Sequence, residues 1–273
     1  MCVRIGSYTS KTRNINNGVP QGAVISPLLF NIMLFDFLMP PTNVNRLLFA
    51  YDITLYAQVK HPMDAEPILQ PYIDKVVKWG RKWKFKFSAP KSSAVSFTRL
   101  YKPGNDPLLF LRGQRIPNAA KAKFLGIIFD AKLLWKDHIE MLINKCTRIK
   151  NAFSIIAKAS YALSHKNLCV LFKSLVRSRI DYGLIAYGSS RKFNIQKLEV
   201  AVRSVLRIIL GSRSSTPTEI LYADTDSEPI PDRRDWLGIR YLININQHPD
   251  NLTYATARKI FNAPDKWPPQ MLP

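Results

Sequence analysis

The chain is poor in acidic residues. Its 273 residues include 19 aspartates and glutamates against 40 lysines and arginines, a formal net charge of +21. Because cations that contact phosphates release condensed counterions, such an excess on a chain that is 47% apolar predicts a polyanionic partner, above all nucleic acid. An anionic membrane and a solvated basic surface are the alternatives that composition leaves open.

Cysteine and histidine are also scarce. The three cysteines are odd in number and show no CxxC spacing, which excludes a disulfide framework and predicts reduced thiols in an intracellular protein. None of the four histidines pairs with a cysteine at zinc-finger spacing, so the sequence predicts no zinc site.

Long apolar runs are absent as well. A membrane span needs about 18 consecutive apolar residues, and the nearest candidate, Ile25–Pro40, is interrupted by Pro27, Asn31 and Asp36. The first residues lack the apolar stretch of a signal peptide. We therefore expect a soluble protein of the nucleus or cytoplasm with no membrane association, and no feature indicates an oligomeric state.

The pattern up to Asp130 alternates between strands and helices. A helix is expected to begin at Ser26 as N-cap, because a proline follows, and a second within Pro62–Phe87, where apolar residues recur at helical spacing. Leu47–Val59 is expected to form a hairpin around Tyr51-Asp52. Further strands are expected at Cys2–Tyr8, Lys11–Ile15, Ala94–Thr98, Leu108–Leu111 (in a hairpin through Ile116) and Lys121–Phe129. This order predicts an α+β fold, with helices on one face of an antiparallel sheet.

After Asp130 the pattern becomes helical and basic. Amphipathic helices are expected at Ile139–Ile156, Asn167–Tyr182 and Asn194–Leu210. Between Ala131 and Pro217 only four residues are acidic, so these helices are the predicted nucleic-acid surface, with solvated helix faces as the alternative. The cations expected on it are Lys145, Arg148, Lys150, Lys173, Arg177, Arg203 and Arg207.

The block Gly18–Ile32, GVPQGAVISPLLFNI, resembles a motif of the non-LTR (LINE-type) reverse transcriptases, especially the jockey-like group. The resemblance implies that Pro20, Gln21 and Gly22 line the template and nucleotide pocket, with the glutamine near the incoming nucleotide. Glycines suit such a loop because they permit close backbone approach. By its residues alone, the block is better interpreted as a loop closed by glycine and proline that leads into a buried helix.

The block Leu47–Ala57, LLFAYDITLYA, resembles LLFADDTALYA, the catalytic hairpin of that family. There, adjacent aspartates and a third from an earlier strand hold the two Mg²⁺ ions of nucleotidyl transfer. This chain has Tyr51 at the first position, which leaves Asp52 as the catalytic and metal-binding carboxylate. A phenol with a pKa of about 10 cannot replace a charged oxygen ligand. The seventeen residues before Gly18 contain no acid, so we expect the third carboxylate to be missing too.

Further landmarks follow in the family's order. Ser88–Ser92 resembles NxxKT, which implies that Lys91 approaches the triphosphate as a general acid; a surface lysine at a strand entry is equally compatible. Phe124–Asp130 resembles the primer grip, which assigns Leu125 and Gly126 to it. His138, in the WxxHI element that follows, is expected to be a packed structural histidine.

Ile180–Gly183, Leu206–Gly211 and Thr216-Pro217 match the YG, LRxIxG and TP landmarks, and Asp36 matches a structural aspartate after the PQG helix. Group II intron and telomerase-type polymerases match the PQG region without the WxxHI and LRxIxG landmarks, so they fit less well.

The resemblance implies an incomplete right hand: a partial palm over residues 1–130, a helical basic thumb over 131–245 and a variable tail over 246–273. It implies an RNA-directed DNA polymerase that uses an RNA template, a DNA primer, dNTPs and Mg²⁺. With two of three carboxylates missing, we expect a truncated, inactive chain. The alternative function is then a non-catalytic nucleic-acid-binding remnant of a decayed mobile element. An incomplete hand should also leave a sheet edge and apolar helix faces uncovered.

Overall fold

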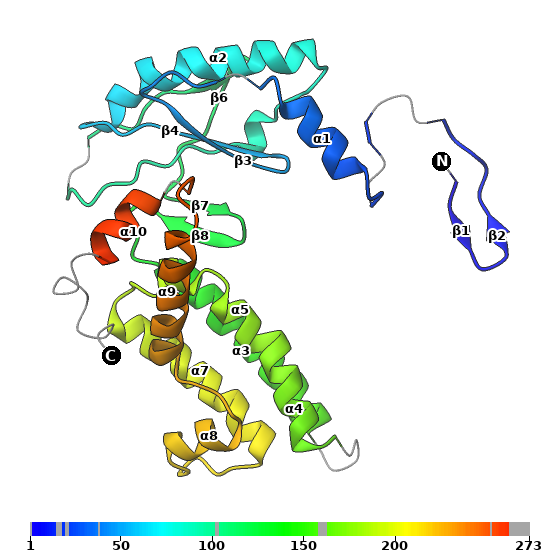
Figure 1. The fold of residues 1–273 in the computed structure, drawn as a ribbon, viewed down its shortest axis with the longest axis vertical. Coiled ribbons are helices and arrows are strands. Elements are labelled where there is room, and N and C mark those ends of the chain that lie inside the picture. The colour runs from blue at the N-terminus through cyan, green and yellow to red at the C-terminus, as the bar shows by residue number, and fades with distance from the viewer. Residues whose placement is uncertain are drawn as a thin grey trace. The chain divides into compact units, whose positions relative to one another are not determined.

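The computed structural model describes residues 2–14, 18–19, 22–37, 39–101, 104–157, 163–251 and 253–261. The chain divides into two compact units, unit 1 up to Ala119 and unit 2 from Ala120 (Figure 1). Helices occur together with small antiparallel ladders, so the predicted α+β class is confirmed. No helix in the described part of the chain is long and apolar enough to cross a membrane.

Unit 1 contains three hairpins and two α-helices among its described residues. Its elements are β1 (Arg4–Ile5), β2 (Tyr8–Thr9), α1 (Ser26–Leu34), β3 (Asn45–Phe49), β4 (Asp52–Tyr56), a 3₁₀ turn (Pro62–Ala65), α2 (Glu66–Lys82), a 3₁₀ turn (Ala89–Lys91), β5 (Phe110–Leu111) and β6 (Gln114–Arg115). The expectation of one continuous sheet is wrong for this region, because each strand pairs only with its hairpin partner. Residues 11–14 are irregular, and the expected strand Ala94–Thr98 makes only a single bridge, from Ala94 to Asn118.

The helix α2 organises the core of unit 1, as its apolar spacing predicts. Tyr72, Val76 and Trp79 recur on one face and are buried. They pack with Phe37 and with the inner side chains of the β3–β4 hairpin, including Leu48. In Figure 1, α2 lies along this hairpin. Removing these aromatic and branched side chains from water is the main stabilising contribution to this unit.

Asp36 joins the end of the α1 segment to α2. Its carboxylate accepts hydrogen bonds from the indole N–H groups of Trp79, at 2.9 Å, and Trp83, at 3.2 Å, and pairs with the Lys82 ammonium at 3.1 Å. The hydrogen bond from Trp79 is the main reason why the pKa of Asp36 lies below its usual value. The prediction that Asp36 is structural is confirmed.

The helix α1 leaves much of its apolar surface open. It begins at Ser26 with Ile25 as N-cap, one residue before the expected cap. Leu28, Leu29 and Ile32 are 57%, 41% and 61% exposed, so much of this apolar surface is uncovered within the described residues. Uncovered apolar helix faces were predicted, and they are present.

Unit 2 is one hairpin followed by helices. Its elements are β7 (Lys121–Phe124), β8 (Ile127–Asp130), α3 (Lys136–Ile156), α4 (His165–Phe172), a π-helical turn (Lys173–Arg177), α5 (Ser178–Asp181), α6 (Leu184–Tyr187), α7 (Lys192–Leu210), α8 (Thr218–Asp224), α9 (Ile230–Asn246) and α10 (Tyr254–Phe261). The helices expected after Asp130 are therefore present. Figure 1 shows α3 and α7 side by side, and their facing side chains, including Phe153, Leu198 and Val202, are fully buried.

The two compact units meet between Ala119 and Ala120, and the predicted palm–thumb boundary at Asp130 stays a prediction. The β7–β8 hairpin belongs with the helices, because Phe129 packs edge-on against the buried ring of Trp135 at 5.2 Å. Asp130 reinforces this contact, since its carboxylate accepts the backbone N–H groups of Leu134, at 2.9 Å, and Trp135, at 2.7 Å.

Candidate functional site

The β3–β4 hairpin presents the candidate catalytic residues at its tip. Phe49 pairs with Asp52 in the ladder, and Ala50 and Tyr51 form the turn. Ala50 has a positive φ of 47°, which lets the two-residue turn follow the strand twist. The expected turn centre, Tyr51-Asp52, is therefore wrong by one residue: Asp52 begins β4, because it is held in register with Phe49.

Tyr51 places an aromatic ring where a second carboxylate is expected. The side chain is 71% exposed, and its ring meets that of Phe30 edge-on at 5.1 Å between centroids. Asp52 is then the one carboxylate at this tip, and no group of three or more His, Cys, Asp or Glu side chains occurs in the described parts of the chain. Two Mg²⁺ ions need several converging carboxylates, so these residues do not fit a two-metal centre.

The loop before α1 is described only in part. Pro20 and Gln21 lie outside the described residues, so their roles remain predictions. Gly22 adopts φ +92°, a conformation that side-chain-bearing residues rarely adopt, and among the described residues beyond its chain neighbours none has an atom within 4 Å of the position of a Cβ. The glycine is thus required by the backbone conformation and not by close packing.

Lys91 ends a short 3₁₀ turn rather than entering a strand. Its backbone N–H donates to the carbonyl of Ser88 at 3.2 Å, and its side chain is exposed. The preceding residues, with the β5–β6 turn, line a shallow hollow of about 370 Å³. Its polar lining comes from Lys86, Ser88, Arg112 and Gln114, so phosphate-compatible groups gather beside this motif.

The turn Leu125-Gly126 of the β7–β8 hairpin is anchored by a distant segment. Both residues have positive φ, 47° and 84°, as a type I′ turn requires. The Tyr182 hydroxyl donates to the carbonyl of Leu125 at 2.6 Å. Gly183 packs so closely that a Cβ there would lie 2.4 Å from Cδ1 of Ile127. The fold thus brings the FLG and YG landmarks together.

His138 is a packed structural histidine, as predicted. It is buried, its Nδ1 accepts the backbone N–H of Ile128 at 3.3 Å, and its ring lies 4.7 Å from that of Tyr187. Burial, with a smaller effect from Lys145, lowers the pKa of His138 to about 4. The imidazole is therefore neutral near pH 7 and joins β8 to α3.

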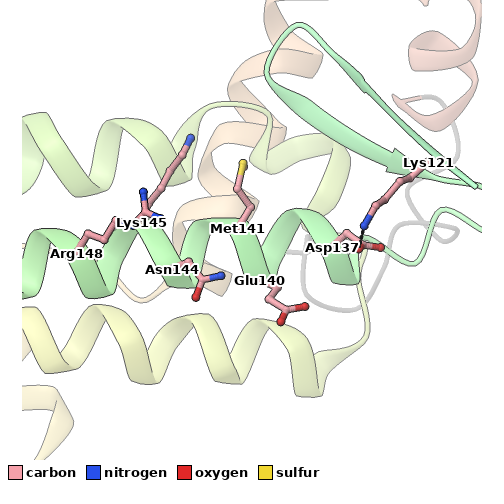
Figure 2. Close-up of a pocket in the computed structure, with 7 residues that line it drawn as sticks. All are labelled: Lys121, Asp137, Glu140, Met141, Asn144, Lys145 and Arg148. Carbon is pink, nitrogen blue, oxygen red and sulfur yellow. Dashed lines mark hydrogen bonds and ion pairs between the residues drawn. The ribbon is translucent and has the colours of Figure 1, made fainter. Parts of the chain in front are cut away.

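Two of the predicted nucleic-acid-binding cations, Lys145 and Arg148, line a second shallow hollow on α3. Its volume is about 390 Å³. Figure 2 shows Lys145 and Arg148 at one end of the hollow, away from Lys121 and Asp137, which form an ion pair of 2.6 Å at the other end. Neither the half-buried Lys145 nor the exposed Arg148 makes an ion pair among the described residues, whereas the charge of Lys121 is compensated by Asp137.

Arg177 is the clearest correction to the predicted surface. It is only 8% exposed, and its guanidinium pairs with Asp181 at 3.3 Å and with Glu228 at 3.7 Å. Arg233 pairs with the same Asp181 at 2.8 Å, so Arg177 belongs to an internal ionic network and not to the outer face. Burial lowers its pKa, and the ion pair with Asp181 opposes that shift.

The π-helical turn explains why the regular helical spacing wrongly predicted Arg177 on the exposed face. A regular helix that buries Leu168 and Phe172 would bury Leu175 as well. The wider turn shifts the buried face by one residue, so Leu175 is 39% exposed and Val176 is 1% exposed. Arg177 is carried inward with it.

The remaining predicted cations differ in availability. Lys173 is exposed but paired with Asp226 at 2.8 Å. Lys150, Arg203 and Arg207 are half-buried. A distant acid limits Lys173, and burial limits the other three, so no local sequence signal separates these residues from Arg148.

The sequence has recognisable relatives. Residues 1–129 match the family model described as "Reverse transcriptase (RNA-dependent DNA polymerase)". The chain is 28% identical to the RNA-directed DNA polymerase from mobile element jockey of Drosophila melanogaster, over 96% of this chain and 29% of that protein. It is 24% identical to a probable RNA-directed DNA polymerase from transposon X-element of the same species, over 94% of this chain and 28% of that one. The chain therefore spans less than a third of these relatives, and no solved structure gives a significant match.

Proposed function

We propose that the chain binds primer–template nucleic acid without extending the primer. Residues 1–129 match the reverse transcriptase family model, and most of the chain is similar to non-LTR retrotransposon polymerases. The absence of nucleotidyl transfer rests on one observation. The tip of the β3–β4 hairpin offers Asp52 as its one carboxylate, with a neutral phenol beside it.

The chemistry of metal binding supports this proposal. Mg²⁺ prefers charged oxygen ligands in near-octahedral geometry. Even if another segment contributed a carboxylate, the hairpin itself would supply only one carboxylate ligand, Asp52. The Tyr51 ring packs edge-on against Phe30, so its side chain makes an aromatic contact where the family has a metal ligand.

The remaining family assignments complete the proposal. Unit 1 would correspond to part of the palm, and the helices of unit 2 to the thumb. In this arrangement Gly22, with Pro20 and Gln21, would lie near the incoming nucleotide, and Lys91 near its triphosphate. Leu125 and Gly126 would contact the primer.

The positive surface of α3 supports binding of the duplex backbone. Lys145 and Arg148 lie about one helical turn apart with their charges uncompensated at one end of the α3 hollow. Each phosphate that they neutralise would release counterions. Arg177 is excluded from this surface because it is buried and paired.

Fluorescence anisotropy with a labelled RNA–DNA hybrid tests the binding half. The double variant Lys145→Gln/Arg148→Gln should lower the slope of log affinity against log salt by about 2, since each lost phosphate contact contributes about 0.9. Lys166→Gln/Lys192→Gln is the matched control, because it removes the same charge from exposed positions outside α3, and it should leave the slope unchanged. Equal slopes for the double variant and the wild type would contradict the assignment.

Primer extension on an RNA template tests the catalytic half. We expect no incorporation above that of Asp52→Asn with Mg²⁺ and dNTPs. Incorporation that depends on Asp52 would instead establish an RNA-directed DNA polymerase. As an independent readout, Tyr51→Asp should raise the affinity for Mn²⁺, measured by the loss of free Mn²⁺ signal in electron paramagnetic resonance, because it restores an adjacent pair of carboxylates.

A further inference from the structure

The solvent face of α2 carries cations that the proposed function does not use. Lys75, Lys78, Arg81 and Lys82 recur every three or four residues and are exposed, opposite the buried face of the helix. Lys84 follows directly, and we call these five residues the α2 basic strip. From Lys75 to Tyr101 the sequence contains eight lysines and arginines and no acidic residue. The strip is the densest part of this run.

Most of this charge is uncompensated. Lys82 pairs with Asp36 at 3.1 Å, but Lys75, Lys78 and Arg81 make no ion pair within the described residues. Like charges three or four residues apart on a helix destabilise it, so the arrangement costs free energy in the isolated chain. Favourable interaction with the helix dipole accounts for cations in the last turn but not for Lys75 and Lys78. A bound polyanion would offset this repulsion.

An exposed aromatic ring lies at the end of the strip. Trp83 is 41% exposed, and the Lys82 ammonium lies 5.3 Å from the centre of its ring. Its indole N–H donates to Asp36, which fixes the plane of the ring. Cations flanking a fixed aromatic surface are typical of sites for single-stranded nucleic acid, because unpaired bases can stack on the ring while the cations follow the backbone.

The same features disfavour a membrane partner. A helix that binds a bilayer surface inserts its apolar face between lipids. In α2 that face, with Tyr72, Val76 and Trp79, is already buried in the core of unit 1. Outside that core the helix and its C-cap expose Pro67, Pro71, Asp74, the cations of the strip and Trp83, so the helix has little apolar surface to insert.

Groups that suit phosphate continue beyond the helix. Lys86, two residues after Lys84, lines the 370 Å³ hollow together with Arg112, Ser88 and Gln114. Arg112 comes from the tip of the β5–β6 hairpin, so a second segment adds a cation to the surface. A nucleic-acid strand that follows the basic strip would therefore meet further hydrogen-bond donors in this hollow.

We propose that the α2 basic strip and Trp83 form a binding surface for single-stranded RNA on unit 1. It is distinct from the α3 cations of unit 2 and does not depend on the proposed loss of nucleotidyl transfer. The RNA backbone contacts Lys75, Lys78 and Arg81, and a base stacks on Trp83.

The test is anisotropy of a labelled oligouridine against salt concentration, with the full chain. The triple variant Lys75→Gln/Lys78→Gln/Arg81→Gln should lower the slope of log affinity against log salt by about 2, because each phosphate contact on a single strand contributes about 0.7. Glutamine keeps helix propensity, and circular dichroism checks that the helix is retained. The matched control, Lys166→Gln/Lys192→Gln/Arg213→Gln, removes the same charge from exposed positions outside the strip and should leave the slope unchanged.

Two further measurements complete the test. Trp83→Leu should weaken oligouridine binding by roughly tenfold at constant salt, through loss of base stacking. Co-sedimentation with phosphatidylserine–phosphatidylcholine vesicles tests the membrane alternative. An unchanged slope in the strip variant, or an equal loss in the control, would overturn the proposal. A loss of vesicle binding with unaltered oligouridine binding would also overturn it.

Discussion

Gly183 makes the tightest contact between the β7–β8 hairpin and the helices of unit 2. It adopts φ +74°, and a Cβ there would lie 2.4 Å from Cδ1 and 3.2 Å from Cγ1 of Ile127. We predict that Gly183→Ala destabilises unit 2 by about 3 kcal/mol. About 1 kcal/mol comes from the left-handed backbone and about 2 kcal/mol from overpacking against Ile127.

A second substitution separates these two contributions. Ile127→Val deletes Cδ1, the atom at 2.4 Å, and keeps Cγ1. Alone it should cost about 1 kcal/mol, as for other losses of one buried methyl group. In the Ile127→Val background, Gly183→Ala should then cost only about 1–2 kcal/mol, because most of the steric clash is gone while the backbone penalty remains.

Differential scanning calorimetry of the four proteins measures this coupling. For a unit of this size, 1 kcal/mol shifts the melting temperature by about 2–4 °C, so Gly183→Ala should lower it by about 6–12 °C. Peptide-resolved hydrogen exchange over residues 121–130 assigns the change to the hairpin. An equal cost of Gly183→Ala in both backgrounds would refute the inference that Ile127 fills the space beside Gly183.

Three other predictions follow from the contacts of unit 2. Arg177→Gln should lower the free energy of unfolding by about 2 kcal/mol, because it leaves Asp181 with a single partner; a stability equal to wild type in urea titrations would contradict the buried ionic network. Burial lowers the pKa of His138 to about 4, so the imidazole binds a proton more readily in the unfolded chain than in the folded one. The contribution of neutral His138 to the free energy of unfolding is therefore complete above about pH 6.5 and is lost as the pH falls towards 4. Between pH 7 and pH 5 the free energy of unfolding should therefore fall by about 2 kcal/mol less in His138→Gln than in the wild type. Identical dependence of the unfolding free energy on pH in the two proteins would count against this. Tyr182→Phe removes the hydrogen bond to Leu125 and should cost about 1 kcal/mol, with faster amide exchange at the hairpin turn; an unchanged exchange rate would show that the turn holds without it.

Local sequence pattern predicts the structure correctly wherever all the residues that form a feature lie in one short segment of the chain. Tyr72, Val76 and Trp79 predict the buried face of α2 because helical spacing alone places them together. The β3–β4 hairpin is evident for the same reason, as is the replacement of a carboxylate by Tyr51. The predicted turn of the β3–β4 hairpin lies one residue too late. The hydrogen-bonded register that pairs Phe49 with Asp52 cannot be read from the sequence.

Prediction failed where a distant segment or a local irregularity intervenes. Arg177 lies in a regular-looking amphipathic pattern, yet the π-helical turn before it shifts the buried face, and Asp181, Glu228 and Arg233 enclose its charge. The basic strip of α2 does not stand out in the sequence, because lysines and arginines are also frequent in the later helices. Whether its cations can bind a polyanion depends on their exposure and on whether acidic side chains pair with them, and neither can be read from the sequence.

The sequence by itself determined the resemblance to reverse transcriptases, the α+β composition and the missing acid at Tyr51, because each depends on residue identity and short-range spacing. Only the tertiary structure decided which cations are available to a polyanion. It also assigned the β7–β8 hairpin to the helical unit, through Trp135, Tyr182 and Gly183. These outcomes depend on contacts between residues far apart in the chain, whose energies are set by burial and close packing and not by local propensity.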